Sequence, residues 1–119
     1  MSWDKLPGRA VNIAADGHGG TWATTLAGRI FYLPPKGYIW QPIEGSATVI
    51  ATAGQQVVSL AKDTGKGQRW SGMSWESLGS ERLIHITVNM QGSIWAVDTN
   101  NNIRKFEGAA ASKPQIFPL

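Results

Sequence analysis

Two stretches of this chain, "GGTWATTLAGRIFYL" (residues 19–33) and "GSIWAVDTNNNIRKF" (residues 92–106), follow one pattern without gaps. The aligned pairs are Gly19 with Gly92, Trp22 with Trp95, Ala23 with Ala96, and Ile30 with Ile103. Each stretch breaks near its middle at a small or turn-forming pair of residues, as a strand, a tight turn and a second strand would. The chain therefore contains an internal repeat, and the repeating unit decides the fold.

Three tryptophans open similar phrases at intervals of 37 and 35 residues. The phrases are "WDKLPGRAVNIAA" from Trp3, "WQPIEGSATVIAT" from Trp40 and "WESLGSERLIHITV" from Trp75. Further along, Trp22 and Ser59 lie 19 residues after their opening tryptophan and Trp95 lies 20 after, so the middle copy differs most. We expect a single domain, residues 1–119, with repeats at about 3–39, 40–74 and 75–110 and a C-terminal edge segment at 111–119.

Within each copy the apolar residues form short runs bounded by Gly, Asn, Asp or Pro, as at residues 11–15, 57–61 and 83–88. Such runs are typical of strands, and no window carries a sustained helical stripe. Each copy holds about four short extended segments, which is the content of one propeller blade. The sequence predicts an all-β fold of three blades.

The phrases "LPGRAVNIAADGHGGTWATTLAGRIF" (residues 6–31) and "GSIWAVDTNNNIRKF" resemble the tectonin repeat of tachylectin-1-like β-propellers. The middle stretch, "AGQQVVSLAKDTGKGQRWSG", departs from that repeat because it lacks the Gly-x-x-Trp. The resemblance implies a six-bladed ring that often binds carbohydrate or lipopolysaccharide.

Closed propellers use about 4 to 8 blades, so three blades leave two open faces. We expect the ring to be completed by homo-oligomerisation, and two chains would supply six blades. The opening "SWDKL" is expected to form the outer strand of the preceding blade, and the tail "KPQIFPL" stands where a fourth such strand would fall. Either end could cross to a partner chain or close the seam within its own chain.

Composition excludes several classes of protein. The chain has no cysteine, so neither disulfides nor thiolate metal sites are expected. Its net charge of +3 comes from basic residues spread along the chain, which does not favour nucleic-acid binding. We find no apolar segment of membrane-spanning length and no recognisable signal peptide, and so expect a soluble protein without membrane insertion; the compartment is not determined by the sequence.

The inventory of reactive groups is thin: four Asp, four Glu and two His. No catalytic constellation, metal site or cofactor site is expected, since catalysis needs convergent groups that the chain does not cluster. We interpret His18, in "DGHGG", as a polar turn residue in preference to a catalytic or metal-binding one. We interpret His85 as a strand residue that packs between blades. Asp98 before three Asn suits a hairpin turn better than a calcium loop, because no acidic partner follows at loop spacing.

Trp70 is the tryptophan that does not recur in register, and it stands in the polar, basic stretch "DTGKGQRWSG". An exposed ring among donors could contact the face of a sugar, so the candidate ligand-binding residues are Lys66, Gln68, Arg69 and Trp70, with His18. The alternative is that Trp70 belongs to a blade strand.

The expected function is glycan binding, to a surface polysaccharide or lipopolysaccharide. The alternative is a structural, protein-interaction subunit of a larger assembly such as a phage tail, with a protein as its partner.

Overall fold

The computed structural model describes residues 2–107, and these residues form ten strands and no helix, which confirms the all-β prediction. The predicted edge segment at 111–119, with the tail "KPQIFPL", lies outside the described residues. The strands are β1 (Asn12–Ala15), β2 (Thr21–Thr24), β3 (Ile30–Leu33), β4 (Gln41–Ile43), β5 (Val49–Ala53), β6 (Gln56–Leu60), β7 (Lys66–Trp70), β8 (Trp75–Val88), β9 (Ile94–Asp98) and β10 (Ile103–Lys105).

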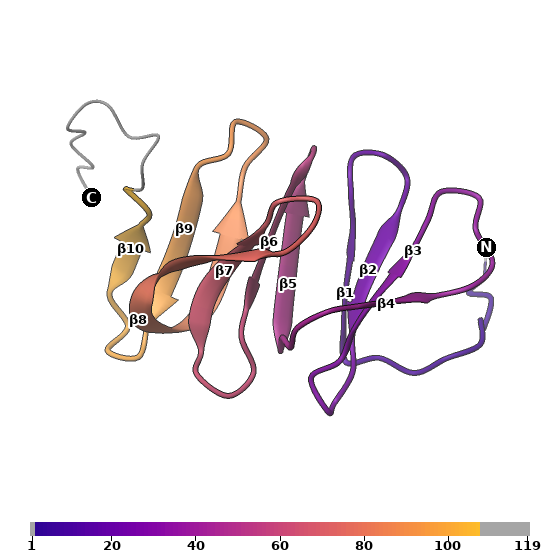
Figure 1. Ribbon diagram of the computed structural model, residues 1–119, viewed down its shortest axis with the longest axis horizontal. Coiled ribbons are helices and arrows are strands. Elements are labelled where there is room, and N and C mark those ends of the chain that lie inside the picture. The colour runs from indigo at the N-terminus through magenta and orange to yellow at the C-terminus, as the bar shows by residue number, and fades with distance from the viewer. Residues whose placement is uncertain (1, 108–119) are drawn as a thin grey trace.

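All strand pairs are antiparallel, and the strands form three blades in a row (Figure 1). Blade 1 is the sheet β1-β2-β3-β4. The long strand β8 serves two blades: residues 75–77 pair with β7, and residues 83–88 pair with β9. Blade 2 is therefore β5-β6-β7 with the start of β8, and blade 3 is the end of β8 with β9 and β10.

The phrases that open the second and third repeats supply the outer strands of the blades before them. β4, directly after Trp40, pairs with β3 of blade 1, and Trp75 at the start of β8 pairs with Trp70 of β7. The chain then crosses inward and begins the innermost strand of the next blade.

Equivalent positions in the three blades are fixed by one hydrogen bond that closes each second hairpin. The donors are Thr25 N to Arg29 O, Ala61 N to Lys66 O, and Asp98 N to Asn102 O. Counting three residues back from each donor makes Trp22, Val58 and Trp95 equivalent. The expected alignment of Ser59 with the two tryptophans is thus wrong by one residue, because four residues separate the paired Thr52 and Val57 whereas five separate the equivalent pair Ala15 and Thr21.

The hydrophobic core lies between blades rather than within any one of them. One cluster joins blades 1 and 2 and contains buried Trp22, Ile30, Ala47, Ile50 and Val57. A second cluster joins blades 2 and 3 and contains buried Val58, Leu60, Ile86, Val88 and Ile94. Each blade therefore depends on its neighbours for burial, as expected of a propeller.

Polar contacts fix the blade 1–blade 2 joint in one register. Asn12 Oδ1 accepts a hydrogen bond from Ile50 N at 2.9 Å, and Thr24 Oγ1 donates to Thr48 O at 3.2 Å. Gly17 N donates to Gly54 O at 2.7 Å, and a side chain on Gly17 would collide with that carbonyl. The two loops at this end of the joint are consequently held against each other.

The hairpin after β9 is organised by Asp98, whose side chain is buried. Its carboxylate accepts hydrogen bonds from the amides of Asn100 (2.8 Å) and Asn102 (3.0 Å) and from Arg104 Nε (2.9 Å). Asn101 takes a positive φ of 66°, which Asn tolerates better than most residues. Asp98 is therefore a hairpin residue, and residues 2–107 contain no group of three or more His, Asp or Glu placed to hold a metal ion.

We predict that Trp22→Ala lowers the free energy of unfolding by about 3–5 kcal/mol, since it empties a large buried site between two blades. Denaturant unfolding followed by circular dichroism would measure the change. Tyr38→Ala is the matched control, because Tyr38 is 97% exposed and its loss should cost less than about 0.5 kcal/mol. Equal, small losses for both variants would contradict the placement of Trp22.

A second prediction concerns acid. The backbone amide of Asn102, more than Arg104 and the Asn100 amide, lowers the pKa of Asp98 to about 2 against the opposing effect of its burial. Because the pKa in the folded state is below the ordinary 3.8, the unfolded chain binds the proton first, and stability should fall as the pH drops from about 4 to about 2. Asp98→Asn should be less stable at pH 7 and lose less on acidification. Urea midpoints at pH 7, 4 and 2.5 test this, and parallel curves for the two proteins would contradict it.

Candidate functional site

A groove of about 330 Å³ opens between blades 1 and 2, at the end of the joint where the β1–β2 loop meets the β5–β6 turn. Its walls combine polar and aromatic side chains from both blades. Those that matter for its chemistry are Asp16, His18, Trp22, Tyr32, Gln55 and Trp70.

The floor of the groove is aromatic. The rings of Trp22 and Tyr32 lie 5.0 Å apart, and Trp70 meets Trp22 edge-on at 5.7 Å. Trp75 extends this group, with its centroid 5.1 Å from that of Trp70. These tilted and edge-on contacts are the favoured geometry of aromatic pairs, so the rings stabilise one another in the floor.

Asp16 is the acidic group of the groove and is half-buried at the start of the β1–β2 loop. Its Oδ1 accepts hydrogen bonds from the amides of His18 (2.8 Å) and Gly20 (2.9 Å). Burial acts to raise the pKa of Asp16, but these two amides, helped by the Tyr32 hydroxyl and more weakly by the Trp22 indole, outweigh burial and lower the pKa below its usual value. Asp16 is thus an ionised hydrogen-bond acceptor at neutral pH.

Tyr32, on β3, packs against Gly20 at the end of the β1–β2 loop. A Cβ on Gly20 would collide with the Tyr32 hydroxyl, so glycine at this position leaves room for the ring. Burial first, and then the negative charge of Asp16 and the hydrogen bond to it, raise the pKa of Tyr32, which keeps its proton. Beside it, Trp22 Nε1 is buried without a hydrogen-bond partner at bonding distance.

The groove therefore offers a charged acceptor, a phenol and flat aromatic area within one open site. This combination suits a ligand that carries hydroxyl donors on an apolar face.

Of the five candidate residues from the sequence, the structure brings His18 and Trp70 together in this groove. Trp70 ends strand β7 and packs on the core cluster, so the alternative of a blade-strand residue describes its position. Gln68 lies between the blades, where its Nε2 donates to Ser59 Oγ (2.9 Å) and Ser46 O (3.0 Å). A ligand role for these residues stays a prediction.

The other two candidates do not line the groove. Arg69 faces the opposite side of blade 2, where its guanidinium carbon lies 5.9 Å from the centroid of the Phe106 ring and its Nε lies 3.5 Å from Glu76 Oε1. Lys66 begins β7 at the other end of that strand and is exposed. Strand alternation separates Arg69 from its neighbours Gln68 and Trp70, which sequence proximity had grouped.

Sequence reasoning missed Asp16, Tyr32 and Trp22 as groove residues. The available signal was the loop "DGHGG", in which an Asp precedes glycines that leave its carboxylate exposed to backbone donors. Tyr32 reaches the same place from the next hairpin through the cross-strand pair Trp22–Tyr32. Pairing of this kind requires the strand register, which the sequence alone did not fix.

None of the described residues belongs to a helix with the length and apolar character needed to cross a membrane. His85 is exposed on β8, where it pairs with Val97, so the expectation that it packs between blades is not met within this chain.

Comparison with known proteins bears on the fold. No protein-family model matches the sequence, and no curated protein matches it. Among solved structures, "YCF48 bound to D1 peptide" is similar, with a TM-score of 0.54 and 22% sequence identity over 87% of this chain and 37% of that chain. The chain spans little more than a third of that structure's chain. The likeness, to a β-propeller, supports a propeller fold, while membership of the tectonin family stays a prediction.

Proposed function

We propose that this chain is a glycan-binding, non-enzymatic β-propeller whose ligand occupies the groove between blades 1 and 2. The observation that carries the proposal is the meeting of an ionised Asp16, the Tyr32 hydroxyl and tryptophan rings in one open groove. Sugars present the complementary surface, because their hydroxyl groups donate to a carboxylate while their C–H faces stack on aromatic rings. This is also the function that the tectonin resemblance implies.

The charge of the groove narrows the class of sugar. An ionised Asp16 attracts hydroxyl donors and repels phosphate or carboxylate groups at short range. We therefore expect neutral sugar units of a surface polysaccharide or lipopolysaccharide to bind here, rather than phosphorylated units. The volume of about 330 Å³ is near the lower end of roughly 300–1,000 Å³ that is usual for ligand sites, which suits a short segment of a glycan.

Asp16→Asn should abolish or reduce glycan binding at least about tenfold while leaving the loop intact, because an Asn side chain keeps the Oδ1 acceptor but not the charge. The chain itself provides the precedent: Asn89 Oδ1 accepts the amides of Gln91 (3.0 Å) and Ser93 (2.9 Å) in the equivalent loop of blade 3. A glycan array followed by titration calorimetry on the strongest hit measures the effect.

Asn89→Asp is the matched control, since it adds a carboxylate at the equivalent loop outside the groove and should leave binding unchanged. Tyr32→Phe removes one hydroxyl and should weaken binding without loss of fold. Wild-type binding that survives both Asp16→Asn and Tyr32→Phe would place the ligand elsewhere.

The second candidate function is a structural, protein-interaction subunit of a larger assembly, such as a phage tail or other particle. It is favoured by the structural neighbour, whose described complex contains a peptide, and a groove between blades could equally receive an extended chain. An array without reproducible glycan binding, together with stable co-purification of one large protein, would favour this function over the first.

We further propose that the propeller is a homodimer, because the three described blades are too few to close and two copies would supply six. Light scattering at micromolar concentration should give about twice the chain mass of 12.9 kDa. A mass of one chain at all dilutions would contradict the dimer, and three chains would require a ring of nine blades.

A further inference from the structure

We propose that two copies of this chain exchange their N-terminal segments: residues 3–6 of one copy add to β10 of the other as the outer strand of its blade 3. The inference rests on the proposed homodimer and names the contact that closes it.

Among the described residues, blade 3 has three strands and its outermost strand, β10, can accept a fourth. Blades 1 and 2 each have a fourth, outer strand, which is β4 in the first and the start of β8 in the second. In the part of the chain that the structure describes, blade 3 ends at β10, which pairs with β9 alone. An open edge presents backbone donors and acceptors to any strand that fits.

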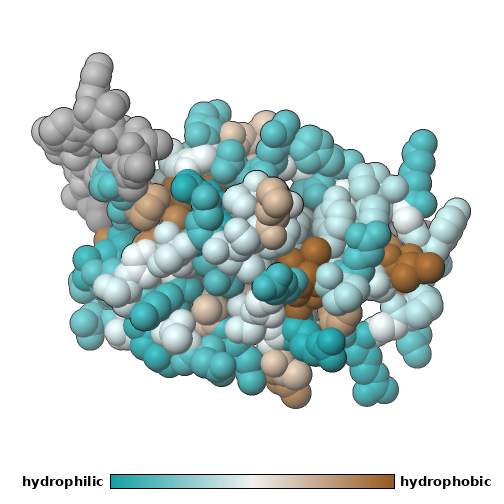
Figure 2. Space-filling model, in the orientation of Figure 1, coloured by the Kyte–Doolittle hydropathy of each residue, from teal (hydrophilic) through white to brown (hydrophobic). Residues whose placement is uncertain are grey.

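The N-terminal segment has the sequence expected of this outer strand. It begins with the phrase that supplies the outer strand in both other repeats, yet residues 2–10 form no strand here. Trp3 is 100% exposed and Leu6 64% exposed, and a hollow of about 480 Å³ separates the segment from the free face of blade 1. Figure 2 shows apolar side chains exposed at this right-hand end of the molecule.

The register of the missing pairing follows from blade 2. There Trp70 pairs with Trp75, and Arg69 pairs with Glu76 and forms an ion pair with it at 3.5 Å. Lys105 is the equivalent of Arg69, because they face the equivalent residues Trp95 and Val58 on the neighbouring strand. The equivalent of Trp75 is Trp3.

Transferring this register places Asp4 opposite Lys105 and Trp3 opposite Phe106. The first pair joins opposite charges, as Glu76 and Arg69 do, and the second joins two aromatic rings, as Trp75 and Trp70 do. Arg69 also lies 5.9 Å from the ring of Phe106, and Lys105 lies 5.5 Å from the ring of Trp95. Each cation thus lies over a ring, and the transferred register brings the Asp4 carboxylate to Lys105 as it brings Glu76 to Arg69.

The apolar residues of the N-terminal segment fit the same register. Leu6 falls opposite Ile103, which repeats the pair of Ile43 with Ile30 in blade 1. Ile30 is 1% exposed beneath blade 2, whereas its equivalent Ile103 is 57% exposed. A second copy docked on blade 3 would cover Ile103 as blade 2 covers Ile30.

The opposite face of the row shows the same contrast. Ile13 is 65% exposed on blade 1, while its equivalents Ile50 and Ile86 are 4% and 2% exposed, each against the preceding blade. The two free faces are therefore the two halves of one repeated joint. A head-to-tail contact between them closes when the rotation completes a ring.

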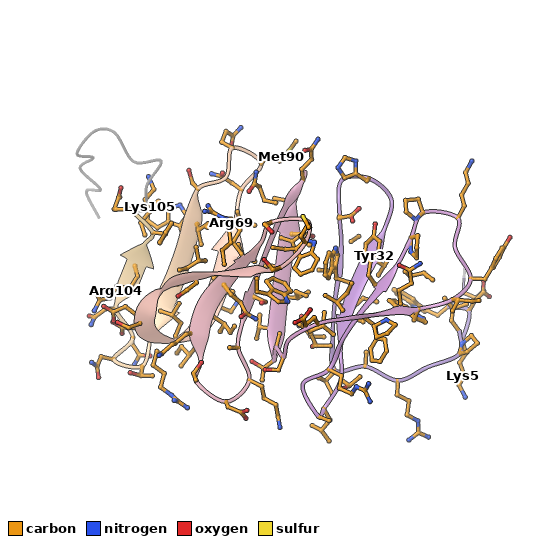
Figure 3. The ribbon with its side chains drawn as sticks, in the orientation of Figure 1. Lys5, Tyr32, Arg69, Met90, Arg104 and Lys105 are labelled. Carbon is orange, nitrogen blue, oxygen red and sulfur yellow. The ribbon has the colours of Figure 1, made fainter. Side chains whose placement is uncertain are left out.

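Pairing within one chain does not fit the structure. Figure 3 shows Lys5 at one end of the molecule and Arg104 and Lys105 at the other. Residues 3–6 and β10 are separated by the length of the blade row, so the exchange joins different copies.

Engineered cysteines test the contact directly, because the chain has none of its own. Asp4→Cys and Lys105→Cys variants are purified separately, mixed and oxidised. Cross-strand partners have Cα atoms about 4.5–5.5 Å apart, within disulfide range. We expect a cross-linked species of about twice 12.9 kDa whose peptide map joins position 4 to position 105.

Lys5→Cys mixed with Lys105→Cys is the matched control, since residue 5 projects from the opposite face of the added strand. It should cross-link at least about tenfold less. A wild-type dimer by light scattering without the 4–105 link, or with links mainly between two identical positions, would overturn the exchange and leave the homodimer standing. A single-chain mass for the wild type would overturn both, and neither result depends on glycan binding.

Discussion

Packing of one blade against the next is the interaction on which the rest of this structure depends. Every large buried side chain of the first cluster, Trp22 and Ile30 among them, is covered by a different blade from its own. A four-stranded sheet of this size cannot bury both of its faces alone. Each repeat therefore depends for its stability on the contact with the neighbouring blade. Ile13 and Ile103, at the two ends of the row, are exposed because no other described blade covers them, whereas equivalent residues in the middle of the row are buried.

The groove is a consequence of the same joint. Where blades 1 and 2 separate at their loop end, the rings that stabilise the joint become the floor of an open site, and Asp16 stands at its rim. The equivalents of Trp22 and Tyr32 are Val58 and Arg69 at the next joint, which replace rings by a smaller apolar residue and a cation. The divergence of the middle repeat therefore gives the two joints of one chain different surfaces.

The sequence predicted most of the fold because the repeat consists of residues with strong local conformational preferences. Tryptophans in register, glycines at turns and short apolar runs sufficed for three blades of extended segments. The site was harder to predict, since Trp70 and Gln68 were grouped with Arg69 by proximity although strand alternation sends Arg69 to the other face. Asp16 was missed because Tyr32 comes close to it through the cross-strand pair Trp22–Tyr32, and that register was not part of the sequence prediction.

A ring of two copies would carry two such grooves in a fixed arrangement, whereas one chain carries a single groove. Each chain carries the Asp16 groove at one of its joints, so a head-to-tail ring presents two such grooves, related by the rotation axis and opening on one face. Two sites on one rigid body convert the second binding event into an intramolecular one when the ligand repeats along a surface. If each groove binds a short sugar unit as proposed, two grooves would bind a repetitive polysaccharide more tightly than one, whereas a free oligosaccharide that reaches one groove at a time would gain nothing from the pair.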